Sequence, residues 1–214
     1  MASTIESGSG KDIIVVDEAD LGKIDVVELP NAEVTEIAVN SAIKGLELGL
    51  SGEKDVAIAG ARLKDTKISN EAPKGETVNV TLAVTKAANL EFTTTGKAAT
   101  ELSVAEGKFL NSSITTAKGK AEDSISFGAS STIKGAFISL GKGRDTLTFS
   151  GRMKGKTTVE SGKGRDLIEV NSKDRGKGKL VLSDFNKKDT LVVGDETFTT
   201  KNLDEAPSWV KFEA

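Results

Sequence analysis

One glycine-rich phrase with an aspartate at its fifth position occurs twice in the sequence. An aspartate beside glycines can either bind a cation or cap backbone amides. The first copy, GKGRDTLTF, occupies residues 141–149, and the second, GKGRDLIEV, occupies residues 162–170. Glycine lets the chain curl so that backbone carbonyls point to one spot, and the aspartate adds a negative charge there. A catalytic loop has no reason to recur at a fixed interval, whereas a repeating backbone does.

The same rhythm, an anchor followed by apolar residues two and four positions later, runs along most of the chain. Asp145 precedes Leu147 and Phe149, and the other anchors precede similar pairs. We align nine anchors at nearly regular intervals: Asp12, Thr35, Lys54, Glu76, Thr100, Asp123, Asp145, Asp166 and Asp189. A repeat of this kind predicts that equivalent residues stack, so the four last aspartates are expected to form one column.

A second alternating patch lies between successive anchors and usually opens with glycine beside lysine. IKGLELGL at residues 43–50 and IKGAFISLG at residues 133–141 are examples. Alternation with a period of two places one side chain inside and the next outside, and Val, Ile, Thr and Phe favour strands. Each repeat is therefore predicted to hold two short strands and two corners.

We predict an all-β, single-domain β-solenoid, either a β-roll or a parallel β-helix, with about eight to nine turns and a period of about 22 residues. Short strands stacked at about 4.8 Å per turn bury apolar faces that no single strand pair could bury. Residues 12–200 would form the repeats, residues 1–11 an N-terminal arm or cap, and residues 201–214 a C-terminal cap. Trp209 and Phe212 would cover the last turn. The rival fold is an antiparallel β-sandwich, which also has short strands at regular spacing.

Composition narrows the function. The 214 residues include no cysteine, no histidine and no tyrosine, which removes disulfides, thiolate metal sites and the commonest general base. We therefore expect a protein that is not an enzyme, and an aspartate column that is structural rather than catalytic. A net charge of −3 gives no overall attraction to nucleic acid, and the apolar stretches are too short to span a membrane. The first ten residues contain no signal-peptide pattern, so we expect no classical secretion signal there.

The phrase Gly-x-Gly-x-Asp-x-apolar resembles the nonapeptide of the RTX (repeats-in-toxin, haemolysin-type) calcium-binding family, Gly-Gly-x-Gly-x-Asp-x-apolar-x. Leu140 and Ser161 replace the first glycine of the family pattern in the two copies. SDFNKKDTLVV, at residues 183–193, is similar to the segment that closes many such arrays. The strict match is confined to the two copies, and the looser rhythm covers most of the chain.

The resemblance implies one Ca²⁺ shared by the two corners, held by about six oxygens. Its ligands would be carbonyls and carboxylates of Gly141, Gly143, Asp145, Gly162, Gly164 and Asp166. A metal-free corner is the alternative, because an aspartate in a turn caps backbone N–H groups and the flanking cations could neutralise it. Both alternatives stay open from the sequence.

The remaining expectations concern partners and setting. Lys142, Arg144, Lys163 and Arg165 would line one edge and could bind a polyanion such as an acidic glycan, or form a solvated edge. A rigid, non-catalytic rod suits a decoration or appendage of a virion (phage) surface, with other virion or surface proteins, or a second copy, as partners. The alternative is a secreted or cell-surface RTX-like bacterial protein that binds calcium in adhesion or in a matrix, exported by a non-classical or type I route.

Overall fold

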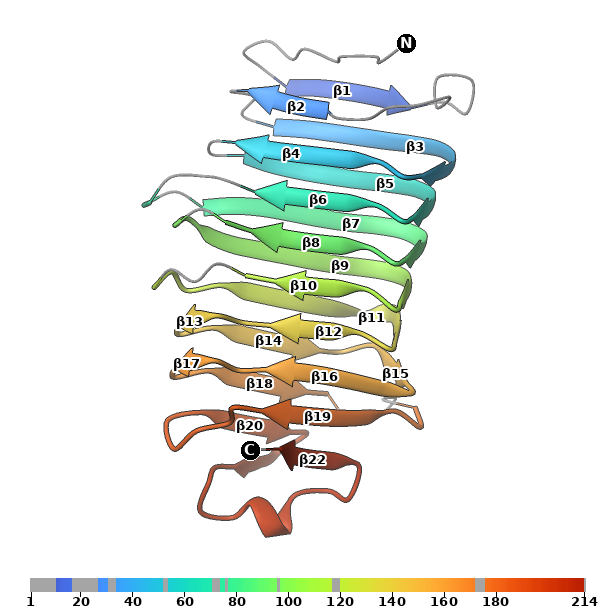
Figure 1. Cartoon of the computed structure of the whole chain (residues 1–214). Coiled ribbons are helices and arrows are strands. Elements are labelled where there is room, and N and C mark those ends of the chain that lie inside the picture. The colour runs from blue at the N-terminus through green and yellow to red at the C-terminus, as the bar shows by residue number, and fades with distance from the viewer. Residues whose placement is uncertain are drawn as a thin grey trace.

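The computed structural model describes residues 11–16, 27–30, 34–51, 54–70, 74–75, 77–95, 97–116, 120–171 and 176–213. The chain coils into a parallel β-solenoid, and each turn lies flat on the turn before it (Figure 1). The solenoid fold predicted from the repeat is confirmed. Of the predicted N-terminal arm, residues 1–10 lie outside the described residues.

Sheet 1 contains the longer strands and follows a path of nine parallel strands with one antiparallel strand at its end. In spatial order its strands are β1 (Lys11–Val16), β3 (Val34–Lys44), β5 (Lys54–Lys64), β7 (Thr77–Ala88), β9 (Ala99–Leu110), β11 (Ser124–Lys134), β14 (Thr146–Phe149), β18 (Leu167–Val170), β20 (Thr190–Val193) and the antiparallel β21 (Glu196–Phe198). A further short strand, β15 (Arg152–Lys154), pairs with the second half of β11.

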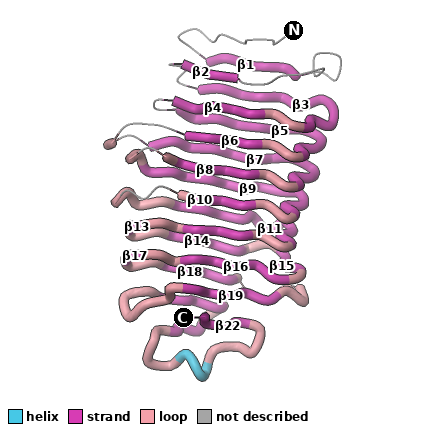
Figure 2. Tube along the Cα trace, in the orientation of Figure 1, coloured by secondary structure: helices cyan, strands magenta, loops and turns pink. Residues whose placement is uncertain are grey.

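Sheet 2 lies opposite sheet 1 and has nine strands, so each turn contributes one strand to each sheet (Figure 2). Its strands are β2 (Val27–Pro30), β4 (Glu47–Ser51), β6 (Lys67–Asn70), β8 (Glu91–Thr94), β10 (Ser113–Thr115), β12 (Phe137–Ser139), β16 (Lys156–Glu160), β19 (Lys179–Ser183) and β22 (Val210–Glu213). The two-residue strands β13 (Lys142–Gly143) and β17 (Lys163–Gly164) pair with each other at a corner.

Successive turns are in register, which is the direct test of the predicted repeat. Leu147 pairs with Ile168 in the next turn, and Val56 pairs with Val80 in the same way. These pairings confirm the predicted period, and the nine rungs of each sheet are in line with the predicted number of turns. The antiparallel sandwich is wrong, because the strands along both sheets pair in parallel from turn to turn.

Asp12 pairs with Thr35 as aligned, but the next two steps between anchors are out of register by two residues. Thr35 pairs with Val56 rather than Lys54, and Lys54 pairs with Val78 rather than Glu76. A slip of two residues keeps every side chain on its face of the sheet, so alternation alone could not detect it.

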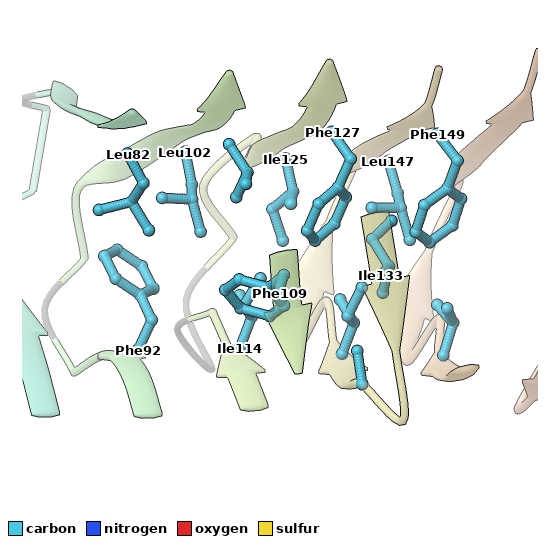
Figure 3. Close-up of a cluster of buried hydrophobic side chains, with 14 of the residues drawn as sticks. Leu82, Phe92, Leu102, Phe109, Ile114, Ile125, Phe127, Ile133, Leu147 and Phe149 are labelled. Atoms are coloured by element: carbon cyan, nitrogen blue, oxygen red, sulfur yellow. The ribbon is translucent and has the colours of Figure 1, made fainter. Parts of the chain in front are cut away.

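The core is a narrow slab between the two sheets. Strand β7 alternates between buried and more exposed residues along most of its length, and its Leu82 faces Phe92 of β8 across the interior (Figure 3). The rings of Phe127 and Phe149 stack from one turn to the next, with centroids 5.4 Å apart. Burial of these side chains without a break is what holds the turns together.

The C-terminal segment both extends the solenoid and ends it. Strand β22 pairs in parallel with β19, so it adds a last rung to sheet 2, while the antiparallel β21 ends sheet 1. Trp209 and Phe212 are partly buried against the core, where the sequence predicts a cover for the last turn. The short 3-10 helix Leu203–Glu205 is the one helical segment of the described residues, among which no helix could cross a membrane.

The two corners of each turn define two edges of the rod. At edge A the chain passes from sheet 2 to sheet 1, and this edge includes β13 and β17, on the left in Figure 1. At edge B the end of each sheet 1 strand leads into sheet 2, on the right in Figure 1. The repeated glycine-rich phrases lie at edge A.

Candidate functional site

The glycines of the repeated phrases permit two turns to approach closely at edge A. Gly141 and Gly162 both have φ of 78°, a left-handed conformation that favours glycine. A Cβ atom on Gly164 would lie 1.9 Å from the carbonyl oxygen of Gly143 in the turn before, and one on Gly143 would lie 2.0 Å from that of Ala121. The second glycine of each phrase is therefore required because no side chain fits between the turns.

The carbonyl groups that the resemblance assigns to calcium accept hydrogen bonds between turns. Lys163 donates its N–H to the Gly141 carbonyl at 2.9 Å, and Arg165 donates its N–H to the Gly143 carbonyl at 3.2 Å. These bonds join the phrase of one turn to the phrase of the next.

The aspartates of the phrases point inward and form the predicted column. The side chains of Asp123, Asp145, Asp166 and Asp189 are all buried, with 1–2% of each residue exposed. Asp145 shares the inward parity of Leu147 and Phe149 two and four residues later, so the alternation already indicates its direction.

Each aspartate in the column binds the backbone of the preceding turn through Oδ1. The Asp123 carboxylate accepts the N–H of Thr100 at 2.8 Å, and that of Asp145 accepts the N–H of Asp123 at 2.9 Å. The Asp166 carboxylate accepts the N–H of Asp145 at 3.0 Å, and that of Asp189 accepts the N–H of Asp166 at 3.1 Å. The column therefore supplies acceptors for buried N–H groups at the corner, which would be costly to leave unpaired.

The second oxygens of these carboxylates differ along the column. Asp189 Oδ2 accepts bonds from the Ser161 hydroxyl at 3.2 Å and from the backbone and side-chain N–H groups of Asn186 at 2.8 Å. The Oδ2 atoms of Asp123, Asp145 and Asp166 are buried without a hydrogen-bond partner. Three carboxyl groups in succession thus have one buried oxygen each without compensation.

Burial makes these three groups weak acids. Desolvation raises the pKa of Asp145 to about 8, and the neighbouring carboxylates of Asp123 and Asp166 raise it as well. Desolvation likewise raises the pKa of Asp123 and the pKa of Asp166 to about 6, against the lowering effect of the N–H groups that both accept and, at Asp123, of the Thr116 and Thr100 side chains. A column of this kind can hold protons near neutral pH.

The residues that replace the first glycine of the family pattern are themselves buried. Leu140 and Ser161 are both fully buried, and the Ser161 hydroxyl contacts Asp189. The Leu140 carbonyl accepts the Thr116 hydroxyl at 2.7 Å. The departure from the family pattern places side chains in the core where the family has glycine.

The four predicted polyanion-binding residues lie exposed at edge A. Lys142 is in register with Lys163, so the same positive charge recurs from one turn to the next. Arg144 lies 3.8 Å from the Glu122 carboxylate, and Arg165 follows one turn later. This row of cations runs outside the column of buried carboxylates.

The predicted calcium ligands are brought to one edge, where several of their oxygens already accept hydrogen bonds. The Gly141 and Gly143 carbonyls and the Oδ1 atoms of Asp145 and Asp166 accept backbone N–H groups. The described residues contain no group of three or more Asp, Glu, His or Cys side chains arranged to hold a metal ion. The buried Oδ2 atoms of Asp145 and Asp166 have no hydrogen-bond partner.

The corner at edge B differs from that at edge A, and the glycine-beside-lysine pattern of the sequence indicates it in only some of the turns. One left-handed residue occurs at this corner in turn after turn, and it is Gly45, Asp65, Asn89, Asn111, Gly135 or Gly155. Asn and Asp adopt this conformation more readily than other side chains, so Gly, Asn and Asp at one offset were the available signal. The Asn89 amide also donates to the Asp65 carboxylate at 2.7 Å, one turn away.

Comparison of the chain with family models, curated protein sequences and solved structures finds no match.

Proposed function

We propose that this chain is a non-catalytic structural protein, a rigid rod that serves as a decoration or appendage of a virion surface. The observation that supports a structural role is the unbroken core. Strand pairing runs through nine rungs of both sheets, and the described core runs without a break from Leu46 to Val210. A stack of nine rungs at about 4.8 Å spacing is on the order of 40 Å long.

Rigidity follows from how the rod is connected. Each turn hydrogen-bonds to its neighbours along both sheets. The turns from Thr100 to Asp189 are joined at edge A by the aspartate column as well. Bending the rod would break several of these ladders together. A spacer or decoration uses this property, which needs neither a cofactor nor a mobile loop.

The setting is tested by finding where the protein resides. Mass spectrometry of density-purified particles from the source culture should find the chain at a fixed ratio to the capsid protein, and protease treatment should leave residues 120–171 intact. Recovery of the chain in the particle-free medium, with none on particles, would overturn the virion setting and favour the secreted alternative.

A second candidate is a secreted or cell-surface protein that binds calcium, and two features favour it. The Gly-x-Gly-x-Asp phrase is repeated in adjacent turns, and the carboxylates of Asp145 and Asp166 each have an oxygen without a partner. If calcium binds, the ligands would come from Gly141, Gly143, Asp145, Gly162, Gly164 and Asp166, and the ion would supply positive charge to the buried carboxylates.

Thermal melting with calcium and with EGTA separates the two candidates. A ligand that binds the folded state alone raises the melting temperature, and saturation at 100 times Kd corresponds to about 2.7 kcal/mol. A rise of several degrees with calcium, lost in Asp145→Asn/Asp166→Asn, would support the calcium-binding protein. If the melting temperature is the same with calcium and with EGTA, at about pH 6 and at about pH 8.5, protons rather than calcium neutralise the buried carboxylates of the column.

A further inference from the structure

Edge B carries a row of cations that the repeated phrases do not mark. The row, which we call the basic stripe, consists of Arg62, Lys86, Lys108, Lys134, Arg152 and Lys154. These residues lie at the ends of β5, β7, β9 and β11 and in β15, where sheet 1 turns toward sheet 2. Five of the six side chains are exposed, and Lys86 is half-buried.

Register places these cations directly beside one another. Arg62 pairs with Lys86, and Lys86 pairs with Lys108 in the next turn. Lys134 pairs with Lys154 farther along the rod, and Arg152 of the same strand follows the same edge. Paired residues of adjacent strands are about 4.8 Å apart, and like charges at that distance destabilise a sheet.

Little negative charge offsets the stripe. Between the cations and the corner residues, the described segments include two acidic side chains, Asp65 and Glu106, and the Asp65 carboxylate accepts the Asn89 amide. Glu47 and Glu91 follow the corner as the first residues of β4 and β8. In the described part of the chain, the two ion pairs are Lys67–Glu47 on sheet 2 and Arg144–Glu122 at edge A. Neither involves the stripe.

The residues beneath the stripe strengthen its potential. Between the cations the alternating positions are occupied by the buried apolar side chains of Leu63, Ala87, Phe109, Ile133 and Met153. Edge A, in contrast, has buried aspartates beneath its cations. The field of the stripe is therefore directed to solvent with no carboxylate behind it.

We propose that the basic stripe binds a linear acidic polysaccharide along the rod. Its charges form two straight rows along the rod, Arg62–Lys86–Lys108 continued past Thr132 by Arg152, and Lys134–Lys154 two residues farther along the strands. Rows with a spacing of about 4.8 Å per turn suit an extended chain of carboxylates or sulfates better than the winding phosphates of a duplex. Single-stranded nucleic acid is usually held by aromatic stacking, and the exposed large apolar side chain of the described residues, Phe137, lies on sheet 2. The proposal does not depend on the virion setting.

The test compares matched variants on the two edges. The stripe variant is Lys86→Gln/Lys108→Gln/Lys134→Gln, and the control is Lys120→Gln/Lys142→Gln/Lys163→Gln at edge A, so both lose three positive charges. Binding of dextran sulfate, polygalacturonate and a single-stranded DNA 20-mer is measured at about 50 mM and about 200 mM salt. Lys86→Arg/Lys108→Arg/Lys134→Arg keeps the charge and tests for effects of the substitutions themselves.

We expect one or both polysaccharides to bind the parent chain, with affinity that falls steeply with salt. The stripe variant should lose about tenfold or more, the edge A control less than about threefold, and the arginine variant little. Which polysaccharide binds more tightly identifies sulfate or carboxylate as the group recognised. Equal losses at both edges, a larger loss at edge A, tighter binding of the DNA, or no polysaccharide binding at the lower salt would each overturn the proposal.

Discussion

Edges A and B both carry the chain from one sheet to the other, but with different chemistry. Edge A uses closely approaching glycines and buried carboxylates that accept N–H groups of the preceding turn. Edge B uses one left-handed residue per turn, with an apolar column inside and cations outside. At edge A the repeated phrase coincides with glycines that have no room for a side chain. Gly107, beside Lys108 of the basic stripe, is as tightly restrained without such a phrase, because a Cβ atom on it would lie 1.8 Å from the Val84 carbonyl oxygen.

The difference sets how much variation each edge tolerates. At edge B, Gly, Asn and Asp alternate at the left-handed position because all three adopt it at moderate cost. At edge A, Gly143 and Gly164 are fixed by contact with the backbone of the turn before, which cannot move without breaking the ladder.

The largest expected effect comes from exchanging a glycine on each edge. Gly164→Ala places a Cβ atom 1.9 Å from the Gly143 carbonyl oxygen, so we expect a loss of about 3 kcal/mol in the free energy of unfolding. Gly155→Ala, at edge B, meets its nearest atom at 3.7 Å and adds only left-handed strain, about 1–2 kcal/mol. Urea denaturation measures both.

Gly155→Asn is the control for strain, because asparagine occupies the same corner at Asn89 and Asn111. It should cost less than Gly155→Ala. A smaller loss for Gly164→Ala than for Gly155→Ala would show that the turns are not as close at edge A as described.

The next effect concerns the hydrogen bonds of the column. Asp145→Ala removes the acceptor for the buried N–H of Asp123, which should cost about 1–3 kcal/mol. Asp145→Asn keeps an acceptor oxygen at that position and should cost less. If the two variants unfold at the same urea concentration, the bond from Asp123 contributes nothing to stability.

The pH dependence follows from the raised pKa values. Because the folded pKa of Asp123, Asp145 and Asp166 lies above the model-compound value of 3.8, the folded state binds more protons than the unfolded chain between about pH 4 and about pH 8. The contribution of these groups to stability is complete below about pH 4 and is lost as pH rises through about 6 and about 8.

Melting temperature should therefore be a few degrees higher at about pH 5.5 than at about pH 8.5. Asp145→Asn should flatten this dependence, since it removes the group with the highest pKa. A melting temperature that rises with pH over this range would mean that the carboxylates are stabilised in their charged form, by calcium or by unseen partners.

The smallest effect is expected at the asparagine of edge B. Asn89→Gly loses the exposed amide bond to Asp65 but relieves the left-handed strain of a residue with φ of 54°. The two changes oppose each other, so the free energy of unfolding should change by less than about 0.5 kcal/mol. A loss as large as that of Asp145→Ala would mean that the Asn89–Asp65 hydrogen bond contributes as much to the free energy of unfolding as the hydrogen bond of Asp145.

Much of the fold could be predicted from the sequence, because the alternation and the repeated phrases are local signals. Leu147 over Ile168 follows from the repeat alone. The steps from Thr35 to Lys54 and from Lys54 to Glu76 are wrong by two residues because no phrase occurs there, and such a shift leaves the alternation unchanged.

The candidate site was harder to predict, because the same residues suit two kinds of chemistry. The family pattern indicates aspartate as a calcium ligand, while its parity with Leu147 directs Asp145 into the core, where it accepts an N–H group. No sequence motif marks the basic stripe. Arg62, Lys86 and Lys108 are neighbours only because of the strand register, which the sequence does not determine with single-residue accuracy.

Carbon-13 NMR of the aspartate carboxyl groups, titrated from acid to alkaline pH in EGTA, tests the aspartate column most directly. We expect Asp145 to titrate near 8 and Asp123 and Asp166 near 6, because all three are buried. If all three lose their protons by about pH 5, as solvated carboxyl groups do, the carboxylates do not form a buried column, and edge A is built in another way.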